Sequence, residues 1–122
     1  MKKDRVLILS TGGTIEKTYA EADGMLSNRE SVIRQRLFDR LRLPHTEIDF
    51  RVIMSMDSLY MNDTHRERIL DHLKKELLND CPILVIHGTD TMARSARYIK
   101  ERIGKLKHPI VFTGAMKPLQ LE

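Results

Sequence analysis

Two threonine-glycine segments carry the residue types best suited to chemistry, and each follows a short apolar run. Thr11-Gly12-Gly13-Thr14 follows the run of residues 6–9 after Ser10, and His87-Gly88-Thr89-Asp90-Thr91-Met92 comes directly after residues 83–86. Glycines let backbone N–H groups approach a ligand closely, and a threonine hydroxyl beside them suits a nucleophile next to an oxyanion site. Because ligands of open parallel sheets bind outside the carboxyl ends of the strands, we expect both segments to face one pocket.

Each segment also has a purely structural interpretation. The first lacks the third glycine of a dinucleotide fingerprint and the Lys-Ser/Thr pair of a phosphate loop, so it could be a glycine turn with a hydroxyl cap. Thr89 or Asp90 could be the N-cap of a following helix, whose N-terminus would also welcome a carboxylate ligand. His87 has no partner at metal-ligand spacing, which favours a hydrogen-bonded structural histidine. We predict no metal and no cofactor.

Strand-like and helical segments alternate along the chain. Expected strands cover residues 5–10, 47–54, 83–87 and 109–113. The first is a continuous apolar run, which suits a central strand covered on both faces. In the second the apolar residues alternate, which suits a strand nearer an edge: Ile48, Phe50, Val52 and Met54.

Three helices are expected between these strands, each with an apolar stripe. The first has a capping box at Ser27 and Glu30 and ends at Pro44, with the stripe Ile33, Leu37 and Leu41. The second starts near residues 62–64 with Thr64 and Glu67 as its capping box, and its stripe is Ile69, Leu70, Leu73 and Leu77. The third ends at Gly104, a residue suited to positive φ, and its stripe is Met92, Ala96, Ile99 and Ile103. Residues 11–26 are expected to form a long functional loop of the kind that serves as a lid.

This alternation predicts right-handed crossovers and a mainly parallel sheet with helices on both faces. We therefore expect one doubly wound, three-layer α/β domain of the Rossmann or flavodoxin-like kind over residues 1–122. The strand order is not readable from the sequence. Whatever that order, the segments holding Thr14, Ser58, Thr89, Asp90 and Gly114 lie at the same edge of such a sheet.

Composition narrows the class of protein. The 122 residues are 41% hydrophobic and 31% charged, with a net charge of +4. No apolar run approaches the roughly 18 residues of a membrane span, so we expect a cytoplasmic protein without membrane contact. The arginines lie on predicted helices with few aromatic neighbours, which indicates solvated faces and no nucleic-acid partner. Cys81 is the one cysteine and is expected to be a small buried apolar group.

The two segments, in this order and at this separation, together with Gly114-Ala115-Met116-Lys117-Pro118, resemble the bacterial-type L-asparaginases and glutaminase-asparaginases. The resemblance covers essentially the whole chain, but only the first part of the family's larger N-terminal domain. It implies hydrolysis of the side-chain amide of asparagine, or of a related carboxamide, to the acid and ammonia. It also implies a threonine nucleophile, an acyl-enzyme intermediate, a small amino-acid substrate and a homo-oligomer.

Carried over by motif, the resemblance assigns catalytic roles to four residues. Thr14 is similar to the family's primary nucleophile, and Tyr19 to the tyrosine that assists it. Thr89 is similar to the second threonine, which acts together with Asp90 and a lysine. In the family that lysine lies beyond Glu122.

The resemblance also implies the contacts to the substrate. Asp90 would bind the α-amino group, and Ser58 the α-carboxylate, with Ser55 as a competing register. Gly88 belongs to the same substrate-binding segment, and the Ala115 backbone would contact the side-chain amide.

Two departures from the family pattern keep other functions open. Leu59 stands where the family has a polar substrate-binding residue, and the family's C-terminal domain, which completes a neighbouring subunit's site, has no counterpart here. The alternatives are a non-catalytic amino-acid-binding module, an inactive fragment that retains the pocket, and an amidotransferase subunit that supplies ammonia.

Overall fold

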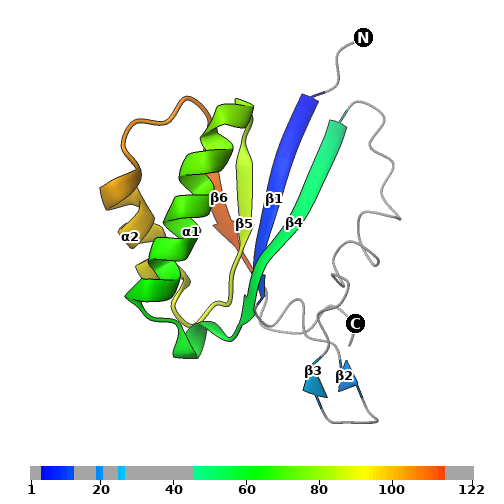
Figure 1. Ribbon diagram of the computed structural model, residues 1–122, viewed down its shortest axis with the longest axis vertical. Coiled ribbons are helices and arrows are strands. Elements are labelled where there is room, and N and C mark those ends of the chain that lie inside the picture. The colour runs from blue at the N-terminus through cyan, green and yellow to red at the C-terminus, as the bar shows by residue number, and fades with distance from the viewer. Residues whose placement is uncertain (1–3, 13–18, 21–24, 27–45, 115–122) are drawn as a thin grey trace.

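The computed structural model describes residues 4–12, 19–20, 25–26 and 46–114 (Figure 1). Its centre is a four-stranded parallel sheet of β1 (Asp4–Gly12), β4 (Thr46–Met56), β5 (Ile83–Ile86) and β6 (Ile110–Thr113). The strands lie in the order β4-β1-β5-β6. The predicted α/β class with a parallel sheet is confirmed.

Strand β1 lies between β4 and β5, as its continuous apolar sequence predicts. Leu7 and Leu9 point to one face and Ile8 to the other, and all three are at most 2% exposed. Ile86 on β5 is also buried against the face of Ile8. The centre of the sheet is therefore covered on both faces, which explains why alternating polar residues are missing from β1 and β5.

Helices α1 (Asp63–Glu76) and α2 (Met92–Ile103) cover one face of the sheet (Figure 1). The steps from β4 to β5 and from β5 to β6 run in the same direction across the sheet, so right-handed crossovers place both helices on the same side. The core between them and the sheet is formed by the buried side chains Leu9, Ile69, Leu73, Val85 and Ile99. The helix expected before Pro44 lies outside the described residues.

The strict alternation predicted for β4 is wrong beyond its middle. Ile48 and Phe50 pack on the face of Ile8, as expected, but Met54 packs against the core beneath α1 and Val52 is 44% exposed. The reason is a break in register. Ser10 of β1 pairs with Val52, whereas Gly12 pairs with Met56, so β4 gains extra residues there and its later side chains change face.

The expected long loop over residues 11–26 is also shorter than predicted. Strand β1 continues through Thr11 and Gly12, and a two-stranded antiparallel ribbon is formed by β2 (Tyr19–Ala20) and β3 (Met25–Leu26). In Figure 1 this ribbon lies at the same end of the molecule as the carboxyl ends of the sheet strands.

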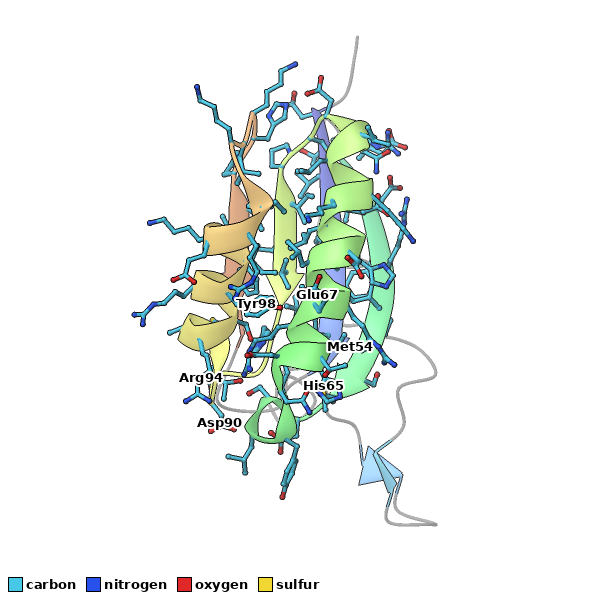
Figure 2. All side chains as sticks on the ribbon, turned by 60° about the vertical axis from the view of Figure 1, so that its left-hand side comes forward. Met54, His65, Glu67, Asp90, Arg94 and Tyr98 are labelled. Carbon is cyan, nitrogen blue, oxygen red and sulfur yellow. The ribbon has the colours of Figure 1, made fainter. Side chains whose placement is uncertain are left out.

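Helix α1 begins at a different cap from the one predicted. The Asn62 side chain, rather than that of Thr64, accepts the N–H groups of Thr64 and His65, and His65 Nδ1 accepts the Asn62 N–H. Glu67 instead accepts a 2.6 Å hydrogen bond from the Tyr98 hydroxyl across the two helices (Figure 2). The buried apolar stripe of α1 also ends before Leu77, which was predicted to belong to it. Leu77 instead starts the 3₁₀ turn η4 (Leu77–Asn79) and is 36% exposed.

Helix α2 confirms its expected surface and end. Gly104 follows the helix with φ of 84°, a backbone conformation that favours glycine. Arg94, Arg97, Lys100 and Arg102 are all exposed, and the Arg102 guanidinium lies 3.6 Å from the centroid of the Tyr98 ring. Across the ranges that the structure describes, neither helix has both the length and the apolar character needed to cross a membrane.

Leu9→Ala should lower the free energy of unfolding by about 2–5 kcal/mol, because it empties a fully buried position between the sheet and the helices. Leu78→Ala is the matched control, since Leu78 is 90% exposed and its loss should change stability by no more than about 0.5 kcal/mol. Urea unfolding followed by circular dichroism measures both. Equal effects of the two substitutions would contradict this placement of the core.

Candidate active site

The strand order places both threonine-glycine segments at one point of the sheet. From β1 the chain moves to β4 on one side, and the later strands β5 and β6 lie on the other side. Such a reversal opens a crevice between the carboxyl ends of the two central strands, where ligands of open α/β sheets bind. Here β1 ends with Gly12, and β5 leads into His87 and Gly88. The predicted convergence of these segments is confirmed as far as Gly12.

Thr11 and Gly12 tie the end of β1 to both neighbours. The buried Thr11 hydroxyl donates a 2.8 Å hydrogen bond to the Ile86 carbonyl, so this threonine fastens β1 to β5. Gly12 has φ of 101°, and a Cβ there would lie 2.6 Å from the Met56 nitrogen of β4. Only glycine allows this close approach to β4 at positive φ.

Ser58 and Gly88 bring the segments after β4 and β5 into contact. Ser58 opens the 3₁₀ turn η3 (Ser58–Tyr60), where the Asp57 carboxylate accepts the Leu59 N–H at 2.9 Å. Ser58 is 1% exposed, and a Cβ added to Gly88 would lie 2.6 Å from its Oγ. The absence of a side chain at residue 88 is what lets these two segments meet.

Thr91 belongs to the second threonine-glycine segment, but the sequence analysis gave it no role. Its hydroxyl donates to the Ser58 carbonyl at 2.9 Å, and its N–H donates to Ser58 Oγ at 3.4 Å. It also occupies the N-cap position of α2, without a side-chain capping bond, so the expectation that Thr89 or Asp90 caps the helix is wrong. In the sequence, Thr91 stands out only as the third residue of the polar run Thr89-Asp90-Thr91.

Thr89 and Asp90 are both exposed in the turn between β5 and α2. Figure 2 shows Asp90 at the N-terminal end of α2, at the carboxyl edge of the sheet. This exposure leaves the hydroxyl and the carboxylate accessible to a ligand, while Gly88 immediately before them is buried. A carboxylate in this position suits a cationic group such as an ammonium.

His87 is fully buried, and its role as a structural histidine is confirmed. Nδ1 lies 2.6 Å from the Gly88 carbonyl oxygen and Nε2 lies 2.8 Å from Ser95 Oγ. Because a carbonyl can only accept, Nδ1 carries the proton of the neutral ring. Burial, and to a smaller extent the charge of Arg66, lower the pKa of His87, while the hydrogen bond to Gly88 opposes this shift.

Arg66 and Ser95 were also missed by the sequence analysis. Arg66 Nε donates to Ser95 Oγ at 2.9 Å, and both side chains are at most 2% exposed. The spacing of each residue from a buried apolar residue could have predicted that it is buried. Arg66 precedes the buried Ile69 by three residues, and Ser95 precedes the buried Ile99 by four, so each polar residue lies on the apolar stripe of its helix.

The remaining predicted site residues either lie outside the described residues or have no described contact that supports their predicted role. Thr14 and Ala115 lie outside the described residues, and Tyr19 is the first residue of β2. Ser55, the competing register for Ser58, is exposed on β4. Leu59 is 61% exposed beside Ser58. Among the described residues no group of three His, Cys, Asp or Glu side chains could hold a metal ion.

Comparison with known proteins identifies the family. Residues 5–121 match the family model described as the N-terminal part of asparaginase. This chain belongs to the asparaginase family. It is 28% identical over 124 aligned residues to L-asparaginase 1 of Escherichia coli K12, covering 98% of this chain and 36% of that protein.

Two further relatives extend the comparison. The thermostable L-asparaginase from Thermococcus kodakarensis has a solved structure that matches this chain with a TM-score of 0.84 and 27% identity, covering 94% of this chain and 35% of that one. One subunit of the glutamyl-tRNA(Gln) amidotransferase of Sulfurisphaera tokodaii is 29% identical over 119 residues, covering 95% of this chain and 26% of that protein. The asparaginase-family chain thus spans about a third of the length of the asparaginases it matches.

Gly88→Ala should destabilise the asparaginase-family domain by about 1–3 kcal/mol, because the new Cβ would collide with the buried Ser58 side chain. The same substitution made in a Ser58→Gly background should cost clearly less, since both the Ser58 Oγ and its Cβ are then gone. Urea unfolding of the four proteins of this double-mutant cycle gives the coupling energy. Purely additive costs would show that the two segments do not touch.

The domain should lose stability as the pH falls below about 6.5, the ordinary pKa of histidine. In that range the unfolded chain takes up a proton that the buried His87 resists, so the free energy of unfolding falls by at most about 1.4 kcal/mol per pH unit from this one group. His87→Asn retains a donor for the Gly88 carbonyl but cannot titrate. Urea unfolding between pH 5 and 8 should therefore show a shallower slope for His87→Asn, and equal slopes would contradict the assignment.

Proposed function

We propose that this chain carries the catalytic segments of an asparaginase-type amidohydrolase, which converts L-asparagine or a related carboxamide to the acid and ammonia. The observation that carries the proposal is the meeting of two segments at one switch point of the sheet. Strand β1 ends there at Gly12, two residues before Thr14 in the sequence, and β5 leads into Gly88, Thr89 and Asp90. Membership of the asparaginase family supports the same reaction class.

The proposed reaction has two steps through a threonine ester. The Thr14 hydroxyl attacks the carbonyl carbon of the side-chain amide, its proton passes to the departing nitrogen, and ammonia leaves. Water then attacks the ester carbonyl, which releases the carboxylic acid and restores the hydroxyl. Tyr19 assists Thr14, and Thr89 with Asp90 forms the second catalytic group.

The substrate contacts follow from charge and position. The exposed Asp90 carboxylate at the start of α2 would bind the α-ammonium group of the substrate. The Ser58 hydroxyl, which lies against Gly88, would bind the α-carboxylate, and the Ala115 backbone would contact the side-chain amide. The homo-oligomer and the cytoplasmic location expected from the sequence stay predictions.

The second candidate is an amino-acid-binding module that does not turn its ligand over. Leu59 favours it, because this side chain is 61% exposed and apolar where the resemblance implies a polar substrate-binding residue. An amidotransferase would use the same hydrolysis to supply ammonia to a partner enzyme, and the likeness to a component of the Sulfurisphaera tokodaii amidotransferase supports that use.

Thr89→Ala should reduce ammonia release from L-asparagine at least about 10²-fold, because it removes a group proposed to take part in proton transfer. Thr14→Ala should do the same through loss of the nucleophile. Thr64→Ala is the matched control, since Thr64 is an exposed threonine on α1. A coupled assay of ammonia measures all three, and an unchanged rate in Thr89→Ala would refute the role of that residue.

Thermal unfolding with added L-aspartate separates the enzyme from the binding module and from an inert domain. A ligand present at 100 times its Kd stabilises the folded state by about 2.7 kcal/mol. Stabilisation without ammonia release would favour the binding module. No stabilisation and no release would contradict both functions.

A further inference from the structure

A buried arginine lies behind the turn that holds Thr89. Arg66 is 2% exposed on the core side of α1, and each end of its guanidinium has a partner. Nε donates to Ser95 Oγ at 2.9 Å, Nη2 donates to the Met61 carbonyl at 3.2 Å, and Nη1 lies 3.0 Å from a carboxylate oxygen of Asp63. Burying a charge is costly unless it is paired and hydrogen-bonded, so this position calls for a reason beyond core packing.

The arginine fixes the direction of a chain of hydrogen bonds. A guanidinium can only donate, so Ser95 Oγ accepts from Arg66 and uses its own proton as a donor. That oxygen lies 2.8 Å from His87 Nε2 and 3.6 Å from the Met61 sulfur, and the ring nitrogen is the stronger acceptor. His87 is thereby held neutral with its proton on Nδ1, which donates to the Gly88 carbonyl at 2.6 Å.

This carbonyl orients the peptide that leads into Thr89. The peptide bond between Gly88 and Thr89 is planar and trans, so its C=O and N–H groups point in opposite directions. With the carbonyl held by His87 in the core, the Thr89 N–H points away from that ring. On its other side, Gly88 rests against Ser58, so both the plane and the position of this peptide are restrained.

We propose that Arg66 is a positioning residue, which acts through Ser95 and His87 to orient the Gly88–Thr89 peptide of the candidate active site. The inference rests on the proposed function in that Thr89 must belong to the catalytic machinery. Arg66 acts at a distance, because its influence passes through the Ser95 hydroxyl, the His87 ring and the Gly88 carbonyl in turn.

Other groups around His87 are consistent with this arrangement. Among the described residues, the charge that acts on His87 is that of Arg66 on α1, whose partner Asp63 is an exposed carboxylate. The centroid of the uncharged Phe112 ring of β6 lies 5.9 Å from that of the His87 ring. A protonated His87 would donate from both ring nitrogens. Ser95 would then have to accept two hydrogen bonds and turn its proton to the Met61 sulfur, next to the positive charge of Arg66.

Nuclear magnetic resonance of the ¹⁵N-labelled chain tests the proposal without substrate. The two-bond ¹⁵N–¹H spectrum of the histidine rings at pH 7 should show His87 neutral with its proton on Nδ1. In Arg66→Met the amide signals of Gly88 and Thr89 should shift and His87 should titrate at a higher pH, because its cationic neighbour is gone. Arg68→Met, an exposed change on the same helix, should leave these signals in place.

Two results would overturn the proposal. One is a wild-type His87 that is charged or carries its proton on Nε2 at pH 7, which needs no variant and so holds even where Arg66→Met fails to fold. The other is a folded Arg66→Met chain whose His87 and Gly88 signals match those of the wild type.

The kinetic test uses the same variants. Arg66→Met should lower kcat for ammonia release about 10–100-fold with little change in KM, because misplacing a catalytic group affects the chemical step more than binding. An unchanged kcat alongside shifted ring signals would overturn the link to Thr89. A wild-type chain that releases no ammonia would overturn the proposed function alone, since the ring spectrum is read without substrate.

Discussion

The pairing of β1 with two parallel neighbours is the constraint on which the rest of this structure depends. Hydrogen bonds to β4 on one side and to β5 on the other leave β1 no free edge over Leu7 to Ser10. Parallel strands end at the same edge of a sheet, so the segments after β1, β4 and β5 emerge side by side. The distant segments that hold Gly12, Ser58 and Gly88 are thereby brought together without a long-range motif in the sequence.

Hydrogen bonds between segments then hold this edge in place. Thr11 bonds the carbonyl of Ile86, and Thr91 bonds Ser58, so each connects parts of the chain that lie more than 30 residues apart. Within the described part of the chain no buried side-chain nitrogen or oxygen lacks a partner. Polar residues in a core are stable only on this condition, and here the same bonds hold the segments after β4 and β5 against each other.

The turn after β5 has a buried side and an exposed side. His87 and Gly88 lie in the core and are held by a chain of hydrogen bonds that reaches Arg66 on α1. Thr89 and Asp90, directly after them, face solvent. A peptide held by buried hydrogen bonds, next to an accessible hydroxyl and an accessible carboxylate, is suited to orienting a bound ligand. The groups that contact the ligand are then already fixed before it binds.

The sequence by itself determined most of the elements and the two threonine-glycine segments at the carboxyl edge of the sheet. Apolar runs and stripes predicted β1, β5, α1 and α2, since burial on one or two faces leaves a period that local sequence carries. Only the tertiary structure decided which polar residues are buried and hydrogen-bonded inside the core. The buried roles of Thr11, Arg66 and Ser95 depend on partners from other elements, and the change of face in β4 depends on its register with β1. Pairings between distant residues are set by packing and strand order, which no local pattern encodes.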